Sequence, residues 1–406
     1  MLQSSISWID FSDQDRRKIM EVVALFRQRD TRDELGLGSI RDAFANLFFP
    51  GTTTLQTRAR YLLFVPWLYW YYEKHRVPSS RIARRLRRDE IKLIDALKSV
   101  DEEGVIGQLS GASLQRFPSS IYWNGLQRWG ILRHMGSQGQ YHRYLDYFYR
   151  QQSERVYDVE PVEGWDGGNW DPGLPPAPDD FPGQADFRLT FPEASYLRER
   201  LLLSCPTSLL AAVADRCQSV TQDVQFIWQH PQHAEFSDRQ RSWIRHAHCF
   251  SEAMYGAALL YNLMLAELRR ADELLDLYRN ALASWQEDMI ASWTVFRSWE
   301  RTAFWRLVKS LGRIPLRTQS FVKEWLDTLL SGSAPVDVVD HARARTLIRE
   351  REVWLKRARS RFESRRHLEM WSGAAGAFKM DYRWSIARRI TNDIIQGRSE
   401  GGNAES

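Results

Sequence analysis

The chain has 406 residues, of which 43% are hydrophobic and 26% are charged, so its composition is that of a soluble globular protein with room for two or three domains. Its formal net charge of +5 is the difference between 56 basic and 51 acidic residues, and the distribution of charge therefore matters more than its total. The seventeen Trp residues favour recognition surfaces as well as cores.

Three cysteines, Cys205, Cys217 and Cys249, form an odd and widely spaced set, which argues against a disulfide framework and fits a reducing cytosol. The N-terminal residues lack the pattern of a signal peptide. The longest apolar run, YLLFVPWLYWYY, is about half the length of a membrane helix and is broken by Pro66. We therefore expect a cytoplasmic protein with no membrane partner. The sequence leaves its oligomeric state open.

The spacing of apolar residues predicts a mainly α-helical fold. Ser12 or Asp13 is placed to cap a first helix, and further helices are predicted over residues 39–48, 57–72 with a kink at Pro66, and 79–97. In the last of these, the surface outside the apolar positions is rich in arginine: Arg81, Arg84, Arg85, Arg87 and Arg88.

Residues 104–150 contain a candidate winged helix-turn-helix. Pro118 is a helix-start signal, Leu126 and Trp129 follow at helical spacing, and Gly130 is placed to end the helix. In such a fold this helix reads DNA, and we expect Ser120, Asn124 and Arg128 to be exposed near the arginines of the preceding helix. The alternative is one more packing helix in a bundle.

Residues 157–192 are rich in Pro and Gly and predict a crossover loop, pinned to the fold by Trp165, Trp170 and Phe181. Long amphipathic helices follow, including one over 220–230, and small residues at Ala253, Gly256 and Ala257 mark 238–270 as the central one. We predict two helical lobes, 1–156 and 193–396, joined by this crossover, and a disordered tail at 397–406.

The sequence predicts no catalytic residue, metal site or cofactor. His230, His233, Glu235, His246, His248 and Cys249 are suitable zinc ligands, but their spacing is poor. The triplet Glu90-Ile91-Lys92 falls on a predicted helix, and the known phosphate-loop, nucleophile-elbow and metalloprotease motifs are missing. A third group of charged residues is assigned a structural role, as an ion-pair network that fixes the turn between helices. Its members are Asp30, Arg32, Asp33, Arg41, Arg58 and Arg60.

The strongest functional signal is a basic block at residues 341–370, with ten Arg or Lys against four Glu. Aromatic residues are interleaved with it, and Arg beside aromatic rings suits phosphate backbones and bases. The alternatives are a solvated helix face and a docking site for an acidic protein. Six arginines of the block are predicted to contact nucleic acid: Arg343, Arg345, Arg357, Arg359, Arg365 and Arg366.

Residues 29–69, RDTRDELGLGSIRDAFANLFFPGTTTLQTRARYLLFVPWLY, resemble the N-terminal signature of a bacterial family known only as a domain of unknown function, number six-three-six-one. PSSIYWNGLQRWGI, GSQGQYHRYLD, FSEAMYGAALLYNLMLAE and DYRW extend the resemblance over nearly the whole chain. The resemblance implies a genomic setting near helicase, phospholipase-D-like nuclease or DNA-modification genes of anti-phage clusters. It implies no catalytic residues.

Residues and resemblance together predict a non-enzymatic nucleic-acid-binding or adaptor subunit of a prokaryotic defence system. Its expected partners are DNA or RNA and a helicase or nuclease that does the chemistry. Two alternatives stay open: a metal-dependent nuclease-type effector that uses the Asp30–Glu34 carboxylates, and a scaffold that binds protein alone.

Overall fold

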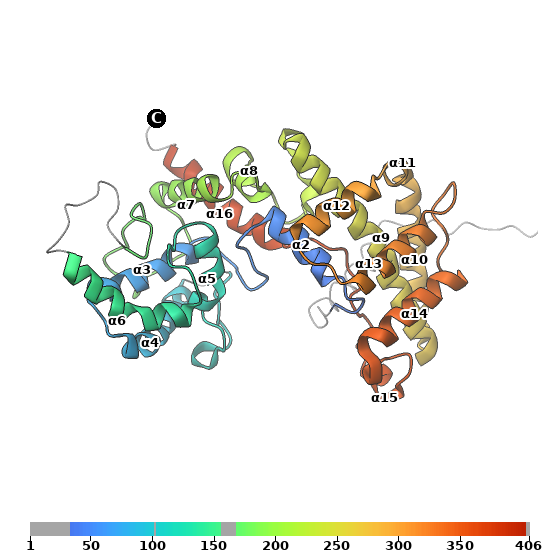
Figure 1. Ribbon diagram of the computed structural model, residues 1–406, viewed down its shortest axis with the longest axis horizontal. Coiled ribbons are helices and arrows are strands. Elements are labelled where there is room, and N and C mark those ends of the chain that lie inside the picture. Colours follow the sequence, from blue (N-terminus) through green and yellow to red (C-terminus); the bar gives the residue numbers. More distant parts are fainter. Residues whose placement is uncertain (1–32, 101–102, 156–167, 403–406) are drawn as a thin grey trace, which may run out of the picture. The chain divides into compact units, whose positions relative to one another are not determined.

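A computed structural model describes residues 33–100, 103–155 and 168–402 (Figure 1). This part of the chain contains fifteen α-helices, α2–α16, and no strand, which confirms the mainly α prediction. Its residues cluster into two compact units. The first joins residues up to Phe44 with Ser242–Met380, and the second joins Ala45–Arg241 with the C-terminal residues from Asp381 onward. Of the predicted crossover at 157–192, the described residues 168–192 lie within the second unit.

The first helices of the second unit follow the predicted spacing. α3 (Tyr61–Lys74) keeps Pro66 inside it and is buried on nearly all sides, as its uniformly apolar sequence requires. α4 (Ser79–Ser99) is amphipathic, with Ile82, Leu86 and Leu93 buried. It packs against α6 (Gln138–Arg155), whose Asp146 accepts hydrogen bonds from the first residue of α4.

α5 (Pro118–Arg128) packs against α3 and the turn at Pro50 and Gly51. Its internal Gly125 has a packing reason. A Cβ atom there would lie 2.9 Å from the carbonyl oxygen of Gly51, so only glycine allows this approach. Gly130, at φ +67°, follows the helix and ends it as predicted. The wing of a winged helix is not seen among the described residues, because the segment after α5 makes only an isolated bridge, between Leu132 and Trp170.

The described part of the Pro/Gly-rich segment is irregular and covers α3. Phe181 stacks on Phe64 at 5.6 Å, and Trp170 is buried with its indole N–H bonded to Glu73. These two rings therefore anchor the segment as predicted, whereas Trp165 lies outside the described residues. α7 (Phe191–Ser204) then begins with a capping box formed by Thr190 and Glu193.

α8 (Leu209–Arg216) and α16 (Trp384–Gly402) complete the second unit, and α16 packs against α7 and α8. The predicted tail begins at residue 397, but the helix continues to Gly402. Gly397 sits so close to Leu189 and Ala194 that a Cβ would come within 2.8 and 2.9 Å of them, and this packing extends the helix.

The predicted helix at 220–230 is wrong. These residues form a loop with one short 3-10 turn, Ile227–Gln229. The carbonyl oxygens of Gln222 and Val224, which a helix would use internally, accept hydrogen bonds from the side chains of Arg388 and Trp384. Tertiary contacts from α16 thus replace the local pattern.

The first unit is built around α9 (Asp238–Arg269), which confirms the predicted central helix. α10 (Asp272–Ala291) lies so close that a Cβ on Gly256 would be 2.2 Å from the Trp285 ring. Asn262, fully buried in α9, accepts hydrogen bonds from the Trp371 indole and the Ala375 amide and holds the 371–375 segment.

The remaining helices of the first unit are short or amphipathic. α2 (Gly38–Phe48) begins in this unit, and the others follow along the chain: α11 (Trp293–Arg297), α12 (Arg301–Leu311), α13 (Leu316–Leu329), α14 (Ala342–Lys356) and α15 (Arg365–Glu369). Among all described helices, none combines the length and hydrophobicity that crossing a membrane requires.

Candidate nucleic-acid interface

One face of α4 carries four cations in a straight row. At 100° per residue, Arg81, Arg84, Arg88 and Lys92 fall within about 80° of each other, opposite the buried apolar positions. All four are exposed. We call these four residues the basic stripe. At about 1.5 Å per residue it is about 16 Å long, which matches roughly five nucleotides of one strand.

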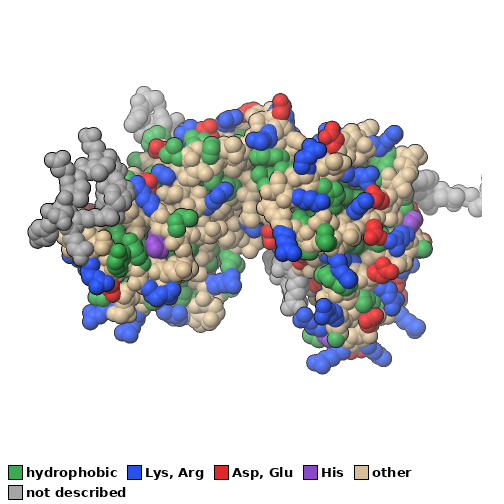
Figure 2. Space-filling view, in the orientation of Figure 1, with side chains coloured by type: hydrophobic (Ala, Val, Ile, Leu, Met, Phe, Trp, Pro, Cys, Tyr) green, Lys and Arg blue, Asp and Glu red, His purple; other side chains and the backbone are tan. Residues whose placement is uncertain are grey.

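The charges of the basic stripe are weakly compensated. Arg88 contacts Asp89 at 3.2 Å, whereas Arg81, Arg84 and Lys92 have no ion pair among the described residues. The first turn of α4 contains no acid, although the positive end of a helix dipole favours one. Arg81 in this turn raises the local positive potential, and the other cations of the stripe extend that potential along the helix, which favours an anionic ligand. Figure 2 shows Lys and Arg side chains gathered over the region that Figure 1 labels α4 and α6.

The predicted arginines of α4 have different roles. Arg84 and Arg88 belong to the basic stripe. Arg85 lies over the Tyr71 ring at 5.3 Å, and Arg87 lies over the Phe117 ring at 4.9 Å. Arg81 and Lys92 were not among the predicted contacts, although all four residues follow the helical spacing i, i+3, i+7 and i+11 in the sequence.

The opposite side of α4 holds a buried carboxyl group. Glu90 is 1% exposed and accepts hydrogen bonds from the backbone N–H and the hydroxyl of Ser119, at the start of α5. Burial raises the pKa of Glu90 from 4.5 to about 8. Lys92, two residues on, is exposed on another face. The Glu-Ile-Lys triplet therefore does not bring its carboxylate and ammonium groups together, as a nuclease site would require.

The exposed positions predicted for α5 are present. Ser120, Asn124 and Arg128 are exposed, while Ile121, Tyr122 and Leu126 face the core. Since Glu90 reaches α5 from the side of α4 that lies opposite the basic stripe, these side chains do not extend that row.

In the first unit, several cations of the basic block pair with acids from elsewhere in the chain. Arg343 pairs with Glu324 and Arg345 with Glu267, whereas exposed Arg365 pairs with Glu369 inside the block. Lys356 and Arg361 both pair with buried Glu34.

Arg351, also in the block, is 5% exposed. It supports the backbone near the start of residues 29–69, which we call the signature segment. Its guanidinium donates to the carbonyl oxygens of Leu35 and Gly36 and to the Thr318 hydroxyl. Burial lowers its pKa from the usual value. Of the predicted contacts, Arg357, Arg359 and Arg366 are exposed without an ion pair among the described residues.

The six residues predicted to form one polar network have separate partners where they are described. Asp33 accepts from the backbone N–H groups of Leu37 and Gly38 and so caps α2, and Arg41 pairs with its neighbour Asp42. Asp30 and Arg32 lie outside the described residues.

Arg58 and Arg60, in the second unit, are each held by an acid distant in sequence. Arg58 pairs with Asp393 of α16 at 3.0 Å, and Arg60 pairs with Glu193 of α7 at 2.9 Å. Burial raises the pKa of Asp393 above its usual value, against the lowering effect of Arg58. Both arginines therefore tie the start of α3 to the C-terminal part of their unit.

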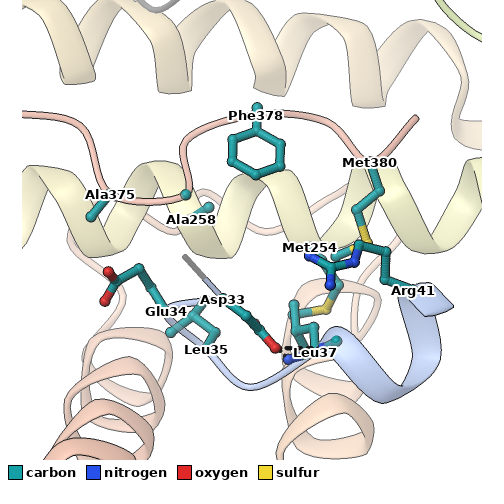
Figure 3. A pocket seen from close by; sticks show the side chains of 12 residues that line it. Asp33, Glu34, Leu35, Leu37, Arg41, Met254, Ala258, Ala375, Phe378 and Met380 are labelled. Carbon is teal, nitrogen blue, oxygen red and sulfur yellow. Dashed lines mark hydrogen bonds between the residues drawn. The ribbon is translucent and has the colours of Figure 1, made fainter. Parts of the chain in front are cut away.

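The signature segment borders a small pocket in the first unit, lined also by Met254, Phe378 and Met380 (Figure 3). Its volume of about 50 Å³ has room for a few water molecules and not for a nucleotide. Figure 3 shows the carboxylates of Asp33 and Glu34 pointing apart. The described carboxylates of the segment thus serve as a helix cap and as an ion-pair partner.

The histidines do not converge. His230 accepts from the backbone N–H of Gln232, His246 accepts from the Trp299 indole, and His248 lies 3.7 Å from Glu252. Desolvation lowers the pKa of both His230 and His246. Residues 33–100, 103–155 and 168–402 contain no group of three or more His, Cys, Asp or Glu side chains that could hold a metal ion.

A family model matches residues 3–397, nearly the whole chain. The chain belongs to DUF6361, described as a family of unknown function. Searches of the curated proteins and of the solved structures each found no match. Membership in DUF6361 confirms the resemblance seen in the signature segment and assigns no activity.

Proposed function

We propose that this DUF6361 protein binds nucleic acid through the basic stripe of α4. The observation that carries the proposal is the row of four exposed cations, three of them without an ion pair among the described residues, which begins in the first turn of α4, where cations are least favourable. Arginine suits phosphate contacts because its planar guanidinium donates two parallel hydrogen bonds. The exposed Arg357, Arg359 and Arg366 of the first unit supply a secondary contact.

The test uses a triple variant, Arg81→Glu, Arg84→Glu and Lys92→Glu, hereafter the α4 triple variant. Affinity for a fluorescent DNA hairpin should fall at least a hundredfold. The thermal midpoint should not fall, because two of the new acids lie near a helix N-terminus. A folded variant that binds the hairpin like wild type would remove the α4 surface from the proposal.

The finer architecture is part of the proposal: two lobes, with α5 acting as a DNA-reading helix that lacks, among the described residues, the wing of a winged helix-turn-helix. The exposed row Ser120, Asn124 and Arg128 on an otherwise buried helix supports this role. Replacing Asn124 and Arg128 by Ala should weaken duplex binding about threefold to tenfold without lowering the thermal midpoint. Unchanged duplex affinity would leave α5 a packing helix.

The protein is further proposed to act as an adaptor beside a helicase or nuclease of a prokaryotic defence system. The genomic setting implied by the family resemblance supports this role, and the contacts of Asp33 and Glu34 favour it over a nuclease that uses these carboxylates. A pull-down from the native host should recover a helicase or nuclease in a nucleic-acid-resistant complex. If neither a helicase nor a nuclease is recovered, and the pure protein cleaves DNA in the presence of magnesium, the alternative of a nuclease-type effector would be favoured.

A further inference from the structure

A hollow of about 680 Å³ opens beside the C-terminal end of α3, within the second unit. This volume lies in the range of small-molecule sites, about 300–1,000 Å³. Its lining combines aromatic and proline surface with charge: Trp67, Trp70, Trp170, Pro172, Lys74 and Arg76. Trp67 and Trp170 are nearly buried walls, whereas Trp70 is 47% exposed.

The negative groups of the hollow are already occupied. Glu73 accepts hydrogen bonds from Tyr141, Asn169 and Trp170. Asp171 pairs with Arg200 at 2.8 Å. Lys74 and Arg76 are the cations of the lining, and Glu73, whose hydrogen-bond donors are all neutral, keeps its negative charge beside them.

Two cations flank the exposed indole. The ammonium group of Lys74 lies 5.3 Å from the centre of the Trp70 ring. Arg76 follows the end of α3 with φ +45°, a left-handed backbone that glycine adopts more easily than arginine.

The hollow adjoins the basic stripe along the chain. Arg76 and Arg81 are five residues apart, so their Cα atoms are at most about 18 Å apart. Tyr71, next to Trp70, also contacts Arg85 of α4. At about 3.4 Å per nucleotide of one strand, a distance of about 18 Å is about five nucleotides, so a strand on the basic stripe has to continue by at most about that length to reach Arg76.

We infer that this hollow binds an unpaired nucleobase, stacked on Trp70, with its phosphate beside Lys74 and Arg76. The inference rests on the proposed function and adds a preference for single-stranded ends to it. Exposed aromatic rings bordered by cations bind bases of any sequence by stacking. The same chemistry fits a base at the end of a strand and the base of a free nucleotide.

The test compares full-length wild type with Trp70→Ala, Trp70→Phe and Arg76→Gly. Trp354→Ala serves as the matched control, since Trp354 is a partly exposed Trp of the first unit. The probes are a blunt DNA hairpin, the same hairpin with a single-stranded tail, and AMP. Wild type, Trp70→Phe and the control should bind the tailed hairpin about tenfold more tightly than the blunt one.

Trp70→Ala and Arg76→Gly should lose this preference while binding the blunt hairpin like wild type. Arg76→Gly should keep or raise the thermal midpoint, which separates loss of a contact from loss of folding. Direct calorimetric binding of AMP, lost in Trp70→Ala, would identify a free nucleotide as the ligand. A tail preference without AMP binding would identify a strand end.

The inference is overturned if Trp70→Ala changes neither tail preference nor AMP binding, or if wild type shows neither property. If the α4 triple variant binds neither hairpin, and none of the proteins prefers the tailed hairpin, the proposed function is kept and the inference about the hollow is rejected. AMP binding that depends on Trp70 in a protein that binds no hairpin would support the hollow and reject the proposed function.

Discussion

The basic stripe of α4 and the basic block at 341–370 have similar charge in the sequence and different surroundings in the fold. α4 has seven basic and three acidic residues, and the block has ten and four. In the block, acids distant in sequence, such as Glu34, Glu267 and Glu324, neutralise many of the cations. In α4 the neighbouring Asp89 and Glu90 are buried, and the stripe faces solvent.

The difference indicates that a run of cations is available to bind an anionic ligand only where the fold leaves it uncompensated. Arg351 and Arg361 of the block support the signature segment through Leu35 and Glu34. Arg81 and Arg84 have no such structural partner among the described residues. Stability measurements on variants of the block therefore test its structural role, and nucleic-acid binding measurements on variants of the stripe test its proposed binding role.

The largest expected effect is on a buried ion pair of the block. Glu34→Gln removes the carboxylate that pairs with Lys356 and Arg361, and we expect it to lower the free energy of unfolding by about 3–5 kcal/mol. The matched change Glu369→Gln breaks the exposed pair with Arg365 and should alter it by less than about 1 kcal/mol. Urea unfolding measures both. Equal effects of the two substitutions on the free energy of unfolding would mean that the pairs with Glu34 stabilise the fold no more than the exposed Arg365–Glu369 pair does.

The next effect is a pH dependence from the buried side of α4. Because the folded pKa of Glu90, about 8, lies above its ordinary value of 4.5, its stabilising contribution is complete below about pH 4.5 and is lost as the pH rises through 8. Wild type should lose about 3–4 kcal/mol relative to Glu90→Gln between pH 5 and pH 9, at about 1.4 kcal/mol per pKa unit. Parallel stability curves for the two proteins would show that Glu90 ionises normally.

The smallest effect is on the helix cap. Asp33→Ala removes the acceptor for the backbone N–H groups of Leu37 and Gly38, and should lower the free energy of unfolding by about 1 kcal/mol. Nucleic-acid affinity should not change. A stable variant that had lost magnesium-dependent cleavage of DNA would instead make Asp33 a catalytic residue.

Local pattern predicted the elements whose stability is local. The start of α5 follows from Pro118 and its end from Gly130, and α9 follows from its small and apolar residues. The loop at 220–230 was not predictable, because its backbone partners, Trp384 and Arg388, are more than 150 residues away.

For the same reason, the sequence could not predict which arginines form ion pairs and which stay exposed. Arg58 and Arg60 find Asp393 and Glu193 only after folding, and so does Arg361 with Glu34. By contrast, the basic stripe was readable from its helical spacing. The hollow was not, since Trp70 and Trp170 are one hundred residues apart in the sequence.

The central claim is that the basic stripe of α4, and not the basic block, is the main phosphate-binding surface. The most direct test is the salt dependence of hairpin binding, compared between the α4 triple variant and a matched reversal of Arg357, Arg359 and Arg366 to Glu. Removing three phosphate contacts should reduce the slope of log affinity against log salt by about 2–3. We predict that reduction for the α4 triple variant and a change of less than about 1 for the block variant. The opposite result, with the slope lost in the block variant and kept in the α4 triple variant, would contradict the account.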